Sequence, residues 1–160
     1  MAELTTLEEK LAEVLGLAQA AQGATEKVEG LTHDDEIAGR LQQMRKEAEE
    51  TEKRCTDVAD ERDGKKTAIL DKARETQSEA TDMMQTYLGS DADDLDGFEY
   101  LIMAEAGEVG HWAVLRKLNE NAGEEQIRDL VDWALPIQER HFQTVNDCAV
   151  ALADEEDPNA

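Results

Sequence analysis

The sequence predicts an all-α protein, an antiparallel four-helix bundle made of two helix hairpins joined by a long crossover that contains an extra helix. Apolar residues recur every three or four positions in four long segments, as in amphipathic helices. The 160 residues include only 2 prolines and 4% aromatics, a composition that favours helices. The connections within each pair of segments are short, whereas the one between the pairs is long. We expect one domain over residues 1–160.

The first predicted hairpin consists of helices at about residues 5–29 and 34–63. Thr5 or Thr6 is placed to cap the first helix, and Gly30–Asp35 breaks the pattern before the second. Both helices carry one apolar stripe. The stripe residues are Leu4, Leu7, Leu11, Leu15 and Ala18 in the first helix, and Ile37, Leu41, Met44, Ala48, Cys55 and Ala59 in the second.

The crossover and the second hairpin are predicted from the same apolar periodicity and turn residues. A weakly amphipathic helix is predicted at about residues 65–88, and Gly89–Gly97 forms an acidic turn. The third bundle helix spans about 96–121 and ends at Asn121–Gly123, where glycine suits a left-handed cap. The fourth spans about 124–154. Its stripe and that of the third helix are Leu101, Ala104, Trp112, Leu115 and Leu118, then Ile127, Leu130, Ala134, Ile137, Val145, Cys148 and Leu152.

The charge balance excludes several classes of partner. Asp and Glu number 39 against 16 Lys and Arg, a formal charge of −23, so the chain has no charge with which to build a basic surface for nucleic acid or for anionic membranes. No apolar run is long enough to cross a bilayer, and the start of the sequence has no signal-peptide pattern. The two cysteines are too few for a disulfide framework. We therefore expect a reduced, cytoplasmic protein.

Polar residues inside the apolar stripes are the informative ones, because an unpaired buried carboxylate is costly. At 100° per residue, Glu108 lies at the centre of the third helix's apolar face, and Glu105 and His111 flank it. On the fourth helix, His141 lies on the apolar face and Gln138 lies at its edge.

The first hairpin contributes a matching set. Glu52 lies on the apolar face of the second helix with Glu49 at its edge, and Glu8 lies at the edge of the first helix's face. Measured from the turn of its own hairpin, Glu8 reaches a depth similar to that of Glu105. We therefore expect these side chains to converge at one level of the bundle.

Converging carboxylates repel each other unless protons or cations neutralise them. One or two divalent ions would do so, and oxygen ligands with an imidazole suit iron or manganese. Two alternatives remain open. The inward carboxylates and imidazole could pair with Arg or His in a non-catalytic structural or interaction bundle with a vestigial polar core, or the acidic chain could take up calcium or magnesium at many weak, unselective sites.

Three stretches carry a resemblance to a known family. Glu105–Gly123 (EAGEVGHWAVLRKLNENAG) resembles the third helix and turn of the YciE/YciF-type family of small stress-associated bacterial proteins, within the ferritin-like superfamily. Asp71–Tyr87 resembles that family's crossover segment, and residues 49–52 (EETE) resemble its Glu-Glu-Thr-His element. The resemblance implies the same bundle fold, a role in stress, and a metal site in the bundle core.

The resemblance also implies a ligand set. The matching positions are Glu8 on the first helix, Glu49 and Glu52 on the second, Glu105 and Glu108 on the third, and Gln138 and His141 on the fourth. Glu52 stands where the family has His, and Gln138 stands where it has Glu, so such a site is expected to hold one metal firmly and a second poorly, or none. His111 is an extra imidazole that partly compensates.

A function follows from the resemblance as an expectation. Iron(II) oxidation or peroxide handling by carboxylate-bridged iron or manganese is implied, with the metal ions and a small oxidant as partners. We also expect a homodimer.

Overall fold

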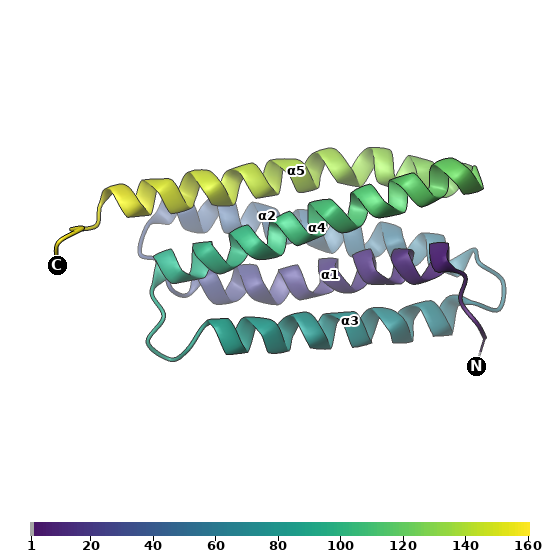
Figure 1. The fold of residues 1–160 in the computed structure, drawn as a ribbon, viewed down its shortest axis with the longest axis horizontal. Coiled ribbons are helices and arrows are strands. Elements are labelled where there is room, and N and C mark those ends of the chain that lie inside the picture. Colours follow the sequence, from purple (N-terminus) through teal and green to yellow (C-terminus); the bar gives the residue numbers. More distant parts are fainter. Residues whose placement is uncertain (1) are drawn as a thin grey trace.

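The computed structural model describes residues 2–160, and these residues form five α-helices and no strand (Figure 1). The helices are α1 (Thr6–Glu29), α2 (Asp35–Asp60), α3 (Lys66–Tyr87), α4 (Asp94–Ala122) and α5 (Glu125–Asp154). In the described part of the chain, no helix combines the length and the apolar character that a membrane crossing requires.

Four of the helices form the bundle and α3 lies outside it. Helix α1 packs against α2 and α4, and α5 packs against α4 and α2. Helix α3 packs mainly on the outer side of α1 and returns the chain along the bundle, so that α2 and α4 run in the same direction (Figure 1). The predicted fold class, two hairpins joined by a helical crossover, is confirmed. As a consequence, the α1–α2 turn and the α4–α5 turn lie at opposite ends of the bundle.

The helix ends are fixed by local hydrogen bonds. At the start of α1, Thr5 Oγ1 accepts from the Glu8 N–H, and the Glu8 carboxylate accepts from the Thr5 N–H at 2.8 Å. Asp93 and Asp96 form the same reciprocal pair at the start of α4. Gly123 ends α4 in the left-handed region, at φ 71°, which favours glycine.

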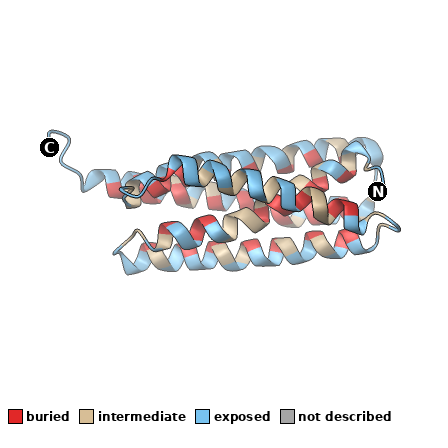
Figure 2. Ribbon diagram, turned by 90° about the horizontal axis from the view of Figure 1, so that it is seen from below, coloured by how far each residue is buried: buried red, intermediate tan, exposed pale blue. Residues whose placement is uncertain are grey.

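The core is divided into two apolar clusters, one toward each end of the bundle (Figure 2 shows the buried positions along the helices). The first is built around Leu11, Leu15, Cys55, Ile69, Trp112 and Ile127. The second is built around Val28, Leu41, Met44, Phe98, Leu101 and Val145. Between them, at mid-length, the buried side chains of α4 and α5 are polar.

Helix α3 approaches α1 closely at Gly16. A Cβ atom at Gly16 would lie 2.7 Å from the Cβ of Thr76 and against the carbonyl oxygen of Ala73, both on α3. The missing side chain therefore permits the contact that holds the crossover helix on the bundle.

Replacing Gly16 by Ala should destabilise the protein by about 1–3 kcal/mol, because α3 must move outward to admit the methyl group. Urea unfolding would measure the loss. Gly23→Ala on the same helix is the matched control, since nothing lies within 4 Å of its Cβ position. There the gain in helix propensity should make the change neutral or stabilising by up to about 1 kcal/mol. Equal stabilities of the two variants would contradict a close α1–α3 contact.

Candidate functional site

A layer of buried polar side chains separates the two apolar clusters. Helix α4 supplies Glu105 and Glu108, and α5 supplies Gln138 and His141. Each pair is spaced three residues apart, which places both members on the inner face of their helix. Glu105 is only 1% exposed. The sequence analysis expected these side chains to face the core, and they do.

The side chains of this layer contact one another. The amide Nε2 of Gln138 donates a hydrogen bond to Oε2 of Glu105. The Nδ1 atom of His141 lies 4.0 Å from that same oxygen. The carboxyl groups of Glu105 and Glu108 are neighbours, so that the protonation of one affects that of the other.

Burial explains why the pair retains a proton. It raises the pKa of Glu105 to about 7, although the hydrogen bonds from Glu108 and Gln138 act in the opposite direction. Burial also raises the pKa of Glu108, and the neighbouring charge of Glu105 raises it further. Two carboxylates this close in a poorly hydrated core cannot both be ionised without a cation.

Glu47 of α2 joins the layer, and the sequence analysis did not identify it. Its Oε1 atom lies 3.1 Å from Nε2 of His141, and both of its oxygens accept hydrogen bonds from Arg140, at 2.9 and 2.7 Å. The bond from Arg140 is the main cause of a lowered pKa of Glu47, and burial lowers the pKa of His141. Its position in the sequence could have identified Glu47, because it lies one helical turn from Met44 and from Thr51, which are both buried.

The first hairpin brings no carboxylate to the centre of this layer. The buried residues of α1 and α2 between the two clusters are small or apolar, with one hydroxyl: Ala18 of α1, and Ala48 and Thr51 of α2. The Thr51 hydroxyl donates to the carbonyl oxygen of Glu47 at 2.9 Å. The fully buried carboxylates at mid-length therefore belong to the second hairpin, and Glu47 reaches the layer only from its edge.

The other predicted ligands of α2 and α4 lie away from the layer. Glu49 is exposed. Glu52 is half-buried and accepts a hydrogen bond from Gln22 of α1 at 3.2 Å. His111 is exposed, with its Nε2 atom 3.8 Å from a carboxylate oxygen of Glu13.

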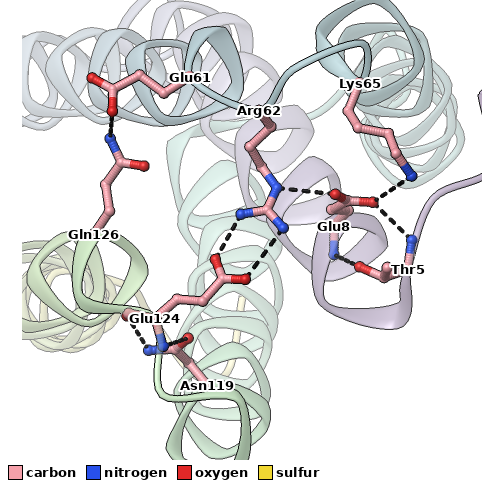
Figure 3. A network of polar contacts seen from close by, with 8 residues as sticks. All are labelled: Thr5, Glu8, Glu61, Arg62, Lys65, Asn119, Glu124 and Gln126. Carbon is pink, nitrogen blue, oxygen red and sulfur yellow. Dashed lines mark hydrogen bonds and ion pairs between the residues drawn. The ribbon is translucent and has the colours of Figure 1, made fainter.

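Glu8 lies at the end of the bundle, in the network drawn in Figure 3. Arg62, in the α2–α3 connection, donates from Nε to Glu8 at 3.0 Å and from both terminal nitrogens to Glu124 at the start of α5. Lys65 donates to the second Glu8 oxygen at 3.3 Å. Burial raises the pKa of Glu8, but hydrogen bonds from the Thr5 backbone, Arg62 and Lys65 outweigh it and lower the pKa overall.

The expected convergence of Glu8 with Glu105 is wrong for a topological reason. Glu8 and Glu105 lie at similar distances from the turns of their own hairpins, but those two turns lie at opposite ends of the bundle (Figure 1). Glu8 is remote from the α1–α2 turn and is therefore near the α4–α5 turn, where Arg62 links it to Glu124.

As arranged, the polar layer is hydrogen-bonded rather than shaped for coordination. Within residues 2–160, no group of three His, Cys, Asp or Glu side chains is placed so that it could hold a metal ion. The layer offers two adjacent buried carboxyl groups, an amide, and an imidazole held by a third carboxylate.

Comparison with known proteins supports the fold. No protein-family model matches the chain, and no curated protein sequence matches it. Among solved structures, the stress protein YciF of E. coli superposes with a TM-score of 0.70 over 94% of this chain and 96% of that one, at 14% sequence identity. The expected likeness of the two folds is thus confirmed.

Replacing Arg62 by Ala should lower the free energy of unfolding by about 2–4 kcal/mol, because it leaves a buried Glu8 carboxylate short of its main cation. The Arg62 side chain is 18% exposed and that of Glu8 is 5% exposed, so water replaces little of the lost contact. Chemical denaturation would measure the loss. Lys53→Ala, which removes an exposed pair with Asp57, should cost less than about 0.5 kcal/mol. If both changes cost the same small amount, the network does not join the hairpins.

The carboxyl pair predicts a pH dependence of stability. In the folded protein the pKa values of Glu105 and Glu108 are raised, the former to about 7, whereas in the unfolded chain both groups have their ordinary value of 4.5. Between these values the folded state binds more protons, so stability present below pH 4.5 is lost as the pH rises through 7.

With a chelator present, the free energy of unfolding should therefore fall between about pH 5 and pH 8, by up to about 1.4 kcal/mol per pH unit for each proton. The Glu105→Gln/Glu108→Gln variant keeps the shape and lacks these protons, so its decline should be shallower. Parallel pH profiles would show that the pair does not hold a proton.

Proposed function

We propose that the protein is a ferritin-like bundle that binds a single divalent ion, iron or manganese, through the polar layer of its α4–α5 hairpin. The ligands would be the carboxylates of Glu105 and Glu108, the imidazole of His141 and the side-chain carbonyl of Gln138. The observation that carries the proposal is the buried pair of carboxyls, which only a proton or a cation can neutralise.

The donor chemistry fits one ion. Carboxylate oxygens with an imidazole suit iron(II) and manganese(II). The 4.0 Å between Nδ1 of His141 and Oε2 of Glu105 is a spacing that two ligands of one ion can span, since such bonds are about 2.1 Å long. Binding would replace the shared proton and require the Gln138 amide to turn, because its NH₂ group now faces Glu105.

The first hairpin does not provide ligands for a second ion. Ala18, Ala48 and Thr51 supply no carboxylate or imidazole at the level of the layer. Glu47 is close to His141 but is held by Arg140, so its role would be to orient the imidazole ring.

The activity is a further step of the same proposal. Iron held in this layer would supply one-electron chemistry toward a small oxidant such as a peroxide. The structural relative is described as a stress protein, and on that basis we extend a stress-related role to this chain. The cytoplasmic location and the homodimer expected from the sequence stay predictions.

One observation favours the alternative of a non-catalytic bundle. Gln138 hydrogen-bonds Glu105, and Glu47 takes up the second ring nitrogen of His141, so the layer is satisfied without metal. In that case the polar layer serves packing specificity alone.

Metal titration separates the two functions. Manganese(II) should bind with one ion per chain and raise the melting temperature. At a free concentration one hundred times Kd, binding should add about 2.7 kcal/mol to the free energy of unfolding. His141→Gln should weaken binding at least about tenfold. Glu139→Gln, an exposed change on the same helix, should leave it unchanged.

The contrary result is equally specific. If the wild type binds no manganese(II) or iron(II), and if Glu105→Gln/Glu108→Gln loses stability without metal, the layer is a structural polar core. Many weak sites that do not distinguish manganese from calcium or magnesium would instead indicate unspecific uptake by the acidic surface.

A further inference from the structure

An apolar cavity opens beside the polar layer. It has a volume of about 200 Å³ and lies between α1, α3 and α4. Six of the fourteen residues that line it are small: Ala20, Ala21 and Ala24 of α1, Ala80 of α3, and Ala104 and Gly107 of α4. Small side chains leave this space because α3 packs on α1 and makes little contact with α4.

The cavity has a polar floor and an apolar mouth. Glu105 and Glu108 both line it. Met83, Met103 and Tyr100 also line it, and they continue into a wider groove between α3 and α4 that includes Tyr87. Met83 is 63% exposed and Met103 50% exposed, so flexible thioether side chains flank the opening.

We propose that this cavity binds a small molecule that has a slender apolar chain and one cationic amino group. The chain would lie along the alanine walls, and the ammonium group would donate hydrogen bonds to the carboxyl oxygens of Glu105 and Glu108. The cavity shares Glu105 and Glu108 with the proposed metal site, but none of the other residues in its walls is a proposed metal ligand.

Size and charge select this class of ligand. A dry apolar cavity of roughly 150 Å³ holds a benzene ring, so about 200 Å³ suits a chain of six to eight non-hydrogen atoms. Among the described residues that line the cavity none is Lys or Arg, and its one imidazole, His111, is exposed, so the two buried carboxyls favour a cationic group over an anionic one. The formal charge of −23 also raises the local concentration of cations around the protein.

Calorimetry with hexylammonium, in chelator and moderate salt, tests the proposal. We expect one molecule to bind per chain, at least tenfold more tightly than hexan-1-ol, which has the same chain without the charge. Hexanoate should not bind. Equal affinities for hexylammonium and hexan-1-ol would overturn the role of the carboxyls, and no binding of either would overturn the site.

A cavity-filling variant locates the site. Ala21→Leu should weaken hexylammonium binding at least tenfold, because the larger side chain occupies the space. Ala38→Leu makes the same change at a half-buried alanine of α2 outside the cavity and should have no effect. An affinity that Ala21→Leu leaves unchanged would overturn the location.

The result can be separated from the metal proposal. Ala21 is not among the proposed metal ligands, so Ala21→Leu should bind manganese(II) as the wild type does. Loss of hexylammonium binding with metal binding intact supports the cavity whether or not the metal has a function. Failure of the wild type to bind hexylammonium rejects the cavity and leaves the metal proposal standing.

Discussion

The structure depends on the burial of two adjacent carboxyl groups, Glu105 and Glu108, at the middle of the bundle. They lie between the two apolar clusters of the core, and Gln138 donates a hydrogen bond to Glu105. A pair of this kind needs a positive charge or a proton. The small residues opposite, Ala18 and Ala48, leave the neutralisation to the second hairpin alone.

The sequence was sufficient for the fold and for the second hairpin's share of the layer. Long stripes with a period near 3.6 determine which residues face inward, and in α4 and α5 the polar residues lie near the middle of a stripe. Glu108 and His141 therefore could be placed with little else known. The left-handed glycine at 123 likewise depends on local chemistry and was predicted, whereas α4 begins at Asp94, inside the predicted Gly89–Gly97 turn, because Asp93 caps it.

The first hairpin could not be assigned from its sequence because Glu8 and Glu49 lie at the edges of the stripes, and Glu52, which lies on the apolar face, is only half-buried. A long side chain at an edge turns toward whichever partner the neighbouring helix supplies. Glu47 turns to His141 and Arg140, whereas Glu52 meets Gln22. These partners are remote in sequence. The position of Glu8 depended on a different unknown, the direction in which the crossover returns the chain, which sets the end of the bundle at which each turn lies.

Two buried carboxylates of the same residue type thus have opposite electrostatic roles. Glu8 has a lowered pKa because the Thr5 backbone, Arg62 and Lys65 already stabilise its charge, and Arg62 also pairs with Glu124, which links this network to the second hairpin. A metal ion there would have to displace two basic side chains. Glu105 has a raised pKa because burial outweighs the hydrogen bond from Gln138 and no Lys or Arg pairs with it, so the cation that we propose would displace only a proton and reorient Gln138. The polar layer and the Glu8 ion pairs are separated along the bundle, so binding of the proposed cation would leave the ion pairs in place.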